Sequence, residues 1–498
     1  MVLSYLQHTK SRNMKSTIRV YGMALAAASI FSACNKIWDK FPGHNKPGDN
    51  DDIVLKNYSV TPSLVKMFPA FNSVGINTLI SSDDVLAGSP EFIYGAQPDG
   101  AGLIENPNGK GYILINNHEI LRSVSRVYLD KNFKPVKGEY IVDADGGQWR
   151  LCSATMATPA EHGFGPVFLT AGESGPDSRV HAIDPLGSVA DKKRTDRVLP
   201  ALGRQSMENA VPFPKDAFPG KTVIAIGEDD GNGQVLLYIS NSVGDLQNGK
   251  LYFLRRTNQD PVETNIELNK KYDVEFVEVD NSTTATGAEI AQQSIDKKAV
   301  QFARVEDLDY RKGGGNNSRE LYFTATGVKD QVGKNMWGRV YKLNLDKNNP
   351  LKGKLEAIAD GGVNPGNDLI NPDNLCVTEN YVYIQEDGDS FYPDAKHDSY
   401  IWIYDINTKK YQPFITTDQR RDNVAFNSKY NTVGNNNLGT WEFGPMYDIS
   451  KTIGVPNTFI LNIHPHTWQE EKFKDADGTT VTGNKEGGQT IILKNVPR

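Results

Sequence analysis

The stretch QFARVEDLDY, Gln301–Tyr310, places one arginine and three acidic residues within ten positions. On a β-strand, successive side chains point to opposite faces, so we expect Arg304 and Glu306 on one face and Val305 and Asp307 on the other. A guanidinium beside a carboxylate can bind a phosphate next to a metal ion. The alternative is an ordinary surface ion pair on an exposed strand, and this stretch alone leaves that alternative open.

Similar acidic segments recur, each roughly 9 to 17 residues before a short apolar strand. These segments are Ser206–Ala210, Arg304–Asp307, Asn371–Asn374 and Trp441–Gly444. The apolar strands belong to six units, each made of a strand with a polar or acidic end, a turn and a second strand. The first strands are Tyr112–Glu119, Val167–Glu173, Val223–Asp230, Glu320–Thr326, Tyr381–Asp387 and Thr458–His464. The second strands are Val127–Asp130, Val180–Asp184, Val235–Ser240, Arg339–Asn344, Tyr400–Asp405 and Gln489–Lys494.

Repeated strand groups of this kind are typical of propellers or solenoids. We expect an all-β fold, a six-bladed β-propeller with inserted strands and loops between the blades. The largest insertion, Ser240–Gln301, contains its own strands, Leu251–Arg255 and Tyr272–Val279.

In a propeller, the innermost strand of each blade lines the central channel, so acidic residues recurring on these strands converge. The residues expected to converge are Glu208, Glu306, Asp373 and Glu442. Packed carboxylates raise one another's pKa, so their convergence implies bound cations. Oxygen ligands suit Ca²⁺, whereas mixed carboxylate and imidazole sets suit iron, manganese or zinc. His118, His464 and His466 lie at strand ends and are either ligands or hydrogen-bonded residues. A fortuitous repeat with its acids on solvent-facing hairpins remains an alternative.

The composition is that of a globular protein, with 23% charged and 9% aromatic residues in a chain of 498. The net charge is −7, and no long basic run follows the first twenty residues, which argues against nucleic acid as the main partner. The sequence contains no Walker-type glycine loop, no GxSxG elbow and no HExxH motif.

The segment Glu228–Gly233 (EDDGNG) reads as a hairpin turn, in which Glu228 or Asp229 is a lesser metal candidate. We expect a monomer.

The N-terminus has the features of a targeting segment. Four basic residues up to Arg19 precede the apolar run Val20–Ala33, which is short for a membrane span. The run ends Phe31-Ser32-Ala33-Cys34 and resembles a bacterial lipoprotein signal with Cys34 lipidated; a plain secretory signal is the alternative. The start is Met1 or Met14. We expect a signal over residues 1–34, a flexible tether over 35–57 and a single propeller domain over 58–498.

Such a signal implies export by the general secretory route and a lipid-anchored protein of the bacterial cell envelope, at the periplasmic or outer-membrane surface. Two cysteines remain after Cys34, namely Cys152 and Cys376. Their wide separation predicts buried thiols without a disulfide framework.

Seven motifs, in order from about Ala96 to the C-terminus, resemble the PhoX-type alkaline phosphatases. These bacterial enzymes have a six-bladed β-propeller whose channel holds iron and calcium ions. The motifs are LINNHE, TPAEHGFGPVFLTAGE, LGRQSMENA, FARVEDLDY, NPDNL, YIQEDG and FILNIHPH. The resemblance implies that Arg304 binds the phosphate of a small phosphorylated substrate and forms a catalytic pair with Glu306. It implies that His464 contacts the substrate. It also implies a set of metal ligands, namely Glu119, Glu173, Glu208, Glu306, Asp373 and Glu442.

The chain departs from the family at the segment Thr170–Glu173, which reads TAGE where the family has TCEE. Ala171 replaces the cysteine that bridges the two irons in the family, and Gly172 replaces the first glutamate. The chain also lacks a twin-arginine signal. These departures favour a calcium-only or altered metal centre over the iron centre of the family. The leading hypothesis is a metal-dependent phosphatase acting on phosphoric esters. The alternative is a catalytically silent, calcium-stabilised propeller that binds a ligand or partner as a lipoprotein.

Overall fold

The computed structural model describes residues 53–388, 395–434 and 437–498. The predicted signal and its lipidation site, Cys34, lie outside the described residues. Ile53–Arg498 forms one compact unit. No helix among the described residues has the length and apolar character needed to cross a membrane.

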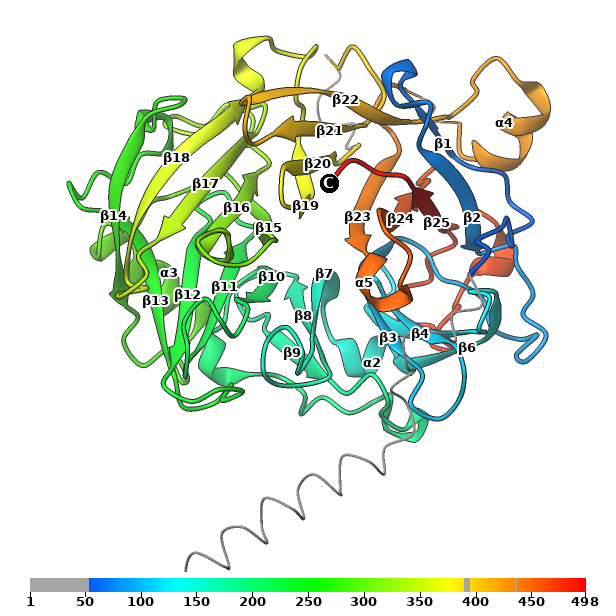
Figure 1. The fold of residues 1–498 in the computed structure, drawn as a ribbon, viewed down its shortest axis with the longest axis horizontal. Coiled ribbons are helices and arrows are strands. Elements are labelled where there is room, and N and C mark those ends of the chain that lie inside the picture. The colour runs from blue at the N-terminus through cyan, green and yellow to red at the C-terminus, as the bar shows by residue number, and fades with distance from the viewer. Residues whose placement is uncertain (1–52, 389–394, 435–436) are drawn as a thin grey trace, which may run out of the picture. The chain divides into compact units, whose positions relative to one another are not determined.

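The unit is nearly all-β, and its antiparallel sheets surround a common axis in a propeller-like arrangement (Figure 1). Each sheet is given in the order in which its strands pair. The first sheet contains β3 (Pro98–Glu105), β4 (Tyr112–His118), β5 (Ser123–Leu129) and β6 (Pro135–Val142), and the second contains β7 (Arg150–Ala157), β8 (Val167–Glu173) and β9 (Val180–Ile183). The third contains β10 (Met207–Pro212), β11 (Thr222–Glu228), β12 (Val235–Ser240), β13 (Lys250–Arg256), β14 (Lys271–Glu278), β18 (Lys352–Asp360), β17 (Arg339–Leu345), β16 (Glu320–Ala325) and β15 (Val305–Tyr310). The fourth contains β19 (Pro372–Val377), β20 (Tyr381–Glu386), β21 (Tyr400–Asp405), β22 (Lys410–Thr417) and β1 (Val65–Met67), and the fifth contains β23 (Glu442–Asp448), β24 (Thr458–His464), β25 (Gln489–Lys494) and β2 (Gly75–Ser81).

Helices are short and lie in the connections. They are α2 (Ala144–Gly147), α3 (Gly287–Asp296), α4 (Val424–Tyr430) and α5 (Ser450–Ile453), with 3₁₀ turns η1 (Pro69–Phe71), η2 (Val189–Asp191), η3 (Pro200–Leu202), η4 (Glu263–Asn265), η5 (Asn317–Arg319), η6 (Gly361–Val363) and η7 (Glu471–Phe473).

All six predicted strand units are present as antiparallel pairs, within a few residues of their expected bounds. The pairs are β4 with β5, β8 with β9, β11 with β12, β16 with β17, β20 with β21, and β24 with β25. Both faces of these strands are covered by neighbouring sheets, which explains their continuous apolar runs. Strand β24, for example, is buried along its whole length.

The predicted insertion Ser240–Gln301 supplies outer strands to the sheets. Strand β13 extends the sheet of β12, and β14 pairs with both β13 and β18. Two strand groups that the sequence predicts as separate blades are therefore joined into one nine-stranded sheet. Helix α3 begins with a capping box, in which Thr286 and Glu289 satisfy each other's backbone N–H groups.

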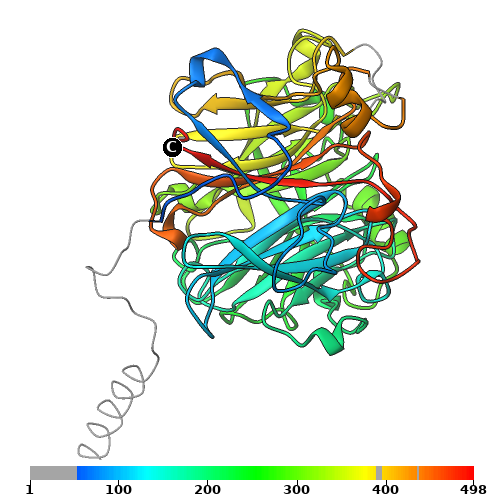
Figure 2. The ribbon, with the colours of Figure 1, turned by 90° about the vertical axis from the view of Figure 1, so that its right-hand side faces the viewer.

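Six strands surround the axis, and each contacts the next until the ring closes. In order, they are β3, β7, β10, β15, β19 and β23, and β23 contacts β3 again. The N-terminal strands complete the outer part of this ring. Strand β2 pairs with β25, with Ile80 opposite Thr490, and β1 pairs with β22, with Val65 opposite Thr417. Figure 2 shows the blue N-terminal strands beside the red C-terminal strand.

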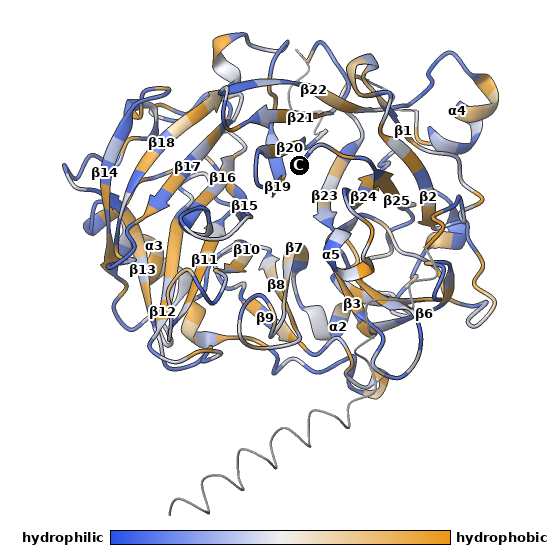
Figure 3. Ribbon diagram, viewed as in Figure 1, coloured by the Kyte–Doolittle hydropathy of each residue, from blue (hydrophilic) through white to orange (hydrophobic). Residues whose placement is uncertain are grey.

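The core consists of apolar clusters between neighbouring strands and sheets, visible as the orange strands of Figure 3. One cluster combines Ile80 of β2 with Ile460 of β24 and Ile492 of β25. Leu55, which the sequence places in a flexible tether, is 7% exposed and belongs to the same cluster. The last part of the predicted tether is thus packed on the folded unit.

Because Ile80 joins the N-terminal strand to the last sheet, Ile80→Ala should lower the free energy of unfolding by about 2–5 kcal/mol. The side chain is 1% exposed, so its truncation leaves a cavity at the point of ring closure. Denaturant unfolding measures the change. Val85→Ala, at a position 74% exposed, is the matched control and should change stability little. Equal stability of both variants would contradict a stabilising role for this closure.

Candidate metal centre

The six axis-lining strands share one irregularity, which lies at an equivalent place in each of them. There, each strand has one residue more than the strand with which it pairs. The register shifts fall between Pro98 and Ala101, Leu151 and Ala154, Met207 and Ala210, Val305 and Leu308, Pro372 and Leu375, and Phe443 and Met446. Such a β-bulge leaves ladder groups unpaired and turns a side chain to a new direction. The first residues inside the six bulges are Asp99, Cys152, Glu208, Glu306, Asp373 and Gly444.

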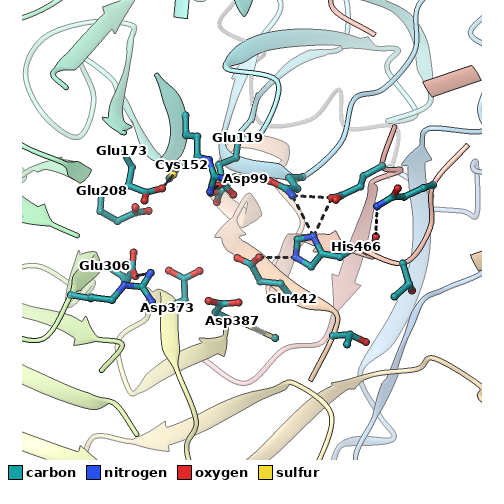
Figure 4. Close-up of a pocket in the computed structure, with 18 of the residues that line it drawn as sticks. Asp99, Glu119, Cys152, Glu173, Glu208, Glu306, Asp373, Asp387, Glu442 and His466 are labelled. Atoms are coloured by element: carbon teal, nitrogen blue, oxygen red, sulfur yellow. Dashed lines mark hydrogen bonds and ion pairs between the residues drawn. The ribbon is translucent and has the colours of Figure 1, made fainter. Parts of the chain in front are cut away.

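Five of these six equivalent residues line one cavity of about 450 Å³; Gly444 does not. Figure 4 shows the carboxylates of Glu173, Glu208, Glu306 and Asp373 around a common space. At the sixth position, a Cβ on Gly444 would lie 2.8 Å from Nε2 of His464, so glycine leaves room for that imidazole. The other cavity-lining ionisable residues are Glu119, Arg150, Glu173, Arg304, Asp387, Glu442, His466 and Glu486.

Seven cavity residues form what we call the carboxylate–thiol ring: Asp99, Glu119, Cys152, Glu173, Glu208, Glu306 and Asp373. It consists of three groups of three, in each of which the ligand atoms lie within 4.8 Å of one another. Cys152 is shared by the first two groups and Glu208 by the last two. Oδ1 of Asp99 is fully buried and has no hydrogen-bond partner. An oxygen-rich set with an orphaned carboxylate oxygen fits a hard cation such as Ca²⁺.

Without bound cations, the ionised form of the carboxylate–thiol ring is destabilised. Burial raises the pKa of Asp99, Glu208, Glu306 and Asp373 well above the usual range, and neighbouring carboxylates raise it further. Burial, with Asp229 and Glu119, raises the pKa of Glu173 to about 9. Burial likewise raises the pKa of the Cys152 thiol. Cations would reverse this balance by stabilising the charged forms.

Arg304 lies beside the ring, immediately before β15. Its Nε is 2.7 Å from Oδ1 of Asp229, and its Nη2 is 2.6 Å from Oε1 of Glu306. Burial opposes the charge, but Glu306 and Asp229 outweigh it and raise the pKa of Arg304. The side chain remains 31% exposed. The backbone φ of Arg304 is +62°, a left-handed conformation also found at Gln97 and Asn371, which precede their bulges in the same way.

The expected neighbourhood of Arg304 and Glu306 is therefore found, and the alternative of a surface ion pair is wrong because Glu306 is only 4% exposed. The expected alternation fails at the bulge. Val305 is in the apolar core, whereas Asp307 accepts a hydrogen bond from the backbone N–H of Leu375, 2.9 Å away, and another from Asn209.

Four of the second residues of the bulges, Ser153, Asn209, Asp307 and Asn374, make hydrogen bonds between the axis-lining strands. Oγ of Ser153 donates to Oδ1 of Asn374 at 2.8 Å, and the backbone N–H of Ser153 donates to Oε1 of Glu208 at 3.2 Å. With Asn209 and Asp307, these residues form a polar layer next to the ring. Satisfied polar networks of this kind hold a site in one geometry.

The predicted metal ligands divide into two sets. Five of the six belong to the ring, including Glu119 after β4 and Glu173 at the end of β8. Nη1 of Arg150 contacts Oε1 of Glu119 at 3.2 Å. The sixth, Glu442, lines the same cavity but groups with His464 and His466.

The histidines differ in position. His464 is fully buried and does not line the cavity; its Nδ1 lies 3.2 Å from Oε2 of Glu442. The geometry thus directs His464 to Glu442, whereas His466 reaches the cavity. Burial opposes the charge of His464, but Glu442 raises its pKa to about 9. His118 contacts Oγ of Ser125 at 2.8 Å and joins none of the ligand groups.

The two lesser candidates of the EDDGNG turn also separate. Asp229 pairs with Arg304, while Glu228 is buried, and neither lines the cavity.

Sequence analysis missed two ring residues, Asp99 and Cys152. Both lie on the axis-lining strands of the first two units, for which no acidic segment was identified. In the later units, the acidic residue precedes the first apolar strand by a similar number of residues. Applying the same spacing to the first two units would have indicated Asp99 and Cys152. Sγ of Cys152 lies 3.3 Å from Oε2 of Glu173, so this cysteine is a buried thiol, as expected, and a cavity residue. Ala171, by contrast, packs in an apolar cluster.

Comparison with known proteins identifies a related fold. No family model matches the chain, and no curated protein matches it. The structure of PhoX from Pseudomonas fluorescens, in complex with the transition-state analogue vanadate, is 14% identical, with a TM-score of 0.59, and the match covers 88% of this chain and 98% of that one. At this identity, the likeness shows a shared, PhoX-like fold.

More distant structures include two other proteins. The α-L-arabinofuranosidase Arb93a from Fusarium graminearum, in complex with an iminosugar inhibitor, is 12% identical with a TM-score of 0.38, and the match covers 84% of this chain and 97% of that one. The PQQ-bound aldose sugar dehydrogenase from Streptomyces coelicolor is 10% identical with a TM-score of 0.33, and the match covers 84% and 98%.

The raised pKa values predict that the metal-free protein loses stability as the pH rises. A carboxyl such as Glu173, whose pKa is higher in the folded than in the unfolded state, keeps more protons when folded, so stability falls from about pH 4.5 toward about pH 9. We expect the Tm of chelator-treated protein to drop by about 5 °C or more over this range. Saturating Ca²⁺ should flatten the profile, as measured by differential scanning fluorimetry. Parallel profiles with and without cations would contradict the ring as a cation site.

Proposed function

We propose that this protein is a metal-dependent phosphoesterase that hydrolyses small phosphoric esters in the cavity at the propeller axis. The observation that carries the proposal is the placement of Arg304, a charged and partly exposed guanidinium, next to seven largely buried groups able to hold cations. Such a cavity can attract a phosphate dianion, because the cations would neutralise the carboxylates and Arg304 would remain positive. The PhoX-like fold also supports the phosphoesterase proposal.

We further propose that the nine-stranded sheet represents two blades joined at β14 and β18, which makes the propeller six-bladed. The six axis-lining strands and their equivalent bulges support this count. Each blade then contributes one bulge to the axis, and five of these bulges place a ligand atom in the ring.

The ring residues would hold the cations, and bound cations supply Lewis acidity that polarises phosphoryl oxygens and lowers the pKa of water. Arg304 would bind and orient the phosphoryl oxygens and stabilise the charge that develops on them. Asp229 and Glu306 hold its guanidinium on two sides, so the side chain is positioned before substrate enters. Glu306 therefore both contacts Arg304 and belongs to the ring.

Calcium is the cation that the oxygens of the ring favour. Cys152 adds one sulfur between two of its groups, although position 171 carries none. Iron is the less favoured occupant, since most ring ligands are carboxylates. The donor set thus fits metal binding in general and calcium first.

Localisation is proposed from the N-terminal sequence alone. A monomer, exported by the general secretory route and lipidated at Cys34, would present the cavity in the bacterial cell envelope. Cys34→Ala should abolish incorporation of a labelled fatty acid and release the protein into the soluble fraction, as followed by fluorography and cell fractionation. Unchanged labelling of the Cys34→Ala variant would contradict lipidation at this residue.

Activity is tested with p-nitrophenyl phosphate, bis-p-nitrophenyl phosphate and phytate, in the presence of Ca²⁺, iron or Mn²⁺. Arg304→Ala should lower kcat/KM at least about 100-fold, because it removes a donor to the charge that forms on the phosphoryl group. Arg255→Ala is the matched control. Arg255 also pairs with a carboxylate, Glu275, but on strands β13 and β14, which do not line the axis.

Absence of turnover with all three substrates and all three cations would overturn the phosphoesterase proposal. The alternative of a silent, calcium-stabilised protein has its own signature in the Glu306→Ala variant. In that case, the variant would lower the Ca²⁺-dependent Tm without any activity to lose. If the protein is an enzyme, Arg304→Ala should abolish turnover while the melting temperature with Ca²⁺ stays close to that of the wild type.

A further inference from the structure

A second cluster of potential ligands lies at the edge of the cavity, outside the carboxylate–thiol ring. Glu442 begins β23, and His464, its partner in the strand register, ends β24. Oε2 of Glu442 lies 3.2 Å from Nδ1 of His464 and 3.1 Å from Nε2 of His466. Figure 4 shows the carboxylate of Glu442 turned toward the ring of His466. Two imidazoles thus converge on one carboxylate oxygen.

The neighbours of His464 determine which of its nitrogens carries hydrogen. Its Nε2 lies 2.9 Å from the carbonyl oxygen of Pro98, which can only accept a hydrogen bond. The hydrogen is therefore on Nε2, and in the neutral imidazole Nδ1 presents a lone pair toward Glu442. This Nδ1 is fully buried and lies 3.2 Å from Oε2 of Glu442.

The neighbours of His466 have the same effect. Its Nδ1 lies 3.1 Å from Oε2 of Glu486, a carboxylate oxygen that accepts a hydrogen bond. Nε2 of Gln97 lies 3.3 Å from the same Nδ1, but this amide donates to Glu486 at 2.8 Å, which holds the carboxylate in place. In the neutral imidazole, the hydrogen of His466 is therefore on Nδ1, and Nε2 presents its lone pair toward Glu442.

In the neutral imidazoles, three electron-pair donors thus face one point, and either protons on the imidazoles or one metal cation balances their mutual repulsion. Metal-bound histidines almost always donate their other N–H to a carboxylate or a backbone carbonyl, which are the partners found here. We infer that Glu442, His464 and His466 form a separate site for one borderline divalent cation, such as zinc or ferrous iron. His466 lines the cavity, so the cation can enter from it.

This site differs in chemistry from the ring. Two of its three ligands are imidazole nitrogens, which favour transition metals over the calcium that an oxygen-rich ring favours. The cavity would then hold two classes of cation side by side. The inference does not rest on phosphoesterase activity, because metal content and turnover are measured independently.

The test uses Co²⁺ as a spectroscopic probe on chelator-treated full-length protein in excess Ca²⁺, which occupies the oxygen sites. We expect one tightly bound Co²⁺ per chain, with visible d–d absorption, and at least a 100-fold loss of Co²⁺ affinity in His466→Gln. Glu486 is a positioning residue, so Glu486→Gln should weaken Co²⁺ binding about 10- to 100-fold. Elemental analysis after gel filtration gives the stoichiometry.

Two controls separate this site from other sources of binding. His162→Gln changes a histidine that is also buried but lies outside the ligand groups, and it should leave Co²⁺ affinity unchanged. Cys152→Ser should leave the d–d bands unchanged, because the sulfur belongs to the ring. The inference is overturned if Ca²⁺ displaces all Co²⁺ or if His466→Gln binds Co²⁺ as tightly as the wild type. If His466→Gln does not fold, Glu486→Gln decides by the same criterion.

Discussion

Mutual repulsion among buried carboxylates at the axis is the constraint on which the rest of the structure depends. Five of the six bulges of the axis-lining strands aim a carboxylate or a thiol at one small cavity. Such a set is tolerated only if a rigid frame holds it and positive charge balances it. The closed ring of strands supplies the frame, with the hydrogen bonds of Ser153, Asn374 and Asp307 behind the ring residues. Arg304 supplies part of the charge, and cations would supply the remainder.

The bulge also explains how equivalent positions in several strands direct their side chains into the same cavity. A regular strand would alternate its side chains between the two neighbouring sheets and direct none of them steadily at the axis. One extra residue breaks that alternation, so Glu306 faces the cavity while Asp307 bonds to the adjacent strands. Repeating the same irregularity in every unit brings residues far apart in the chain to one level. Glycine at position 444 breaks the pattern and gives its space to His464.

Much of the fold could be predicted from local patterns in the sequence. The six strand pairs were predictable because strands buried on both faces read as apolar runs ending in turns. The convergence of Glu208, Glu306 and Asp373 was predictable because they recur at a similar offset from those runs. Asp99 and Cys152 were not found, since an aspartate in PDGAG and a cysteine in LCSAT carry no acidic cluster to draw notice. The joining of β14 to β18 was equally hidden, because pairing between distant outer strands leaves no periodic signal.

Pairing of β2 with β25, which completes the last sheet, imposes an order on folding. During synthesis, β2 (Gly75–Ser81) is made well before its partner β25 (Gln489–Lys494). Strand β2 must therefore wait with an unpaired edge until β25 has been made, and exposed edges of this kind invite wrong pairing. The site is subject to the same delay, because Glu442 and His464 belong to the last sheet and meet Asp99 and Pro98 only when the ring closes. Assembly of the cavity is thus among the final events in the maturation of the molecule.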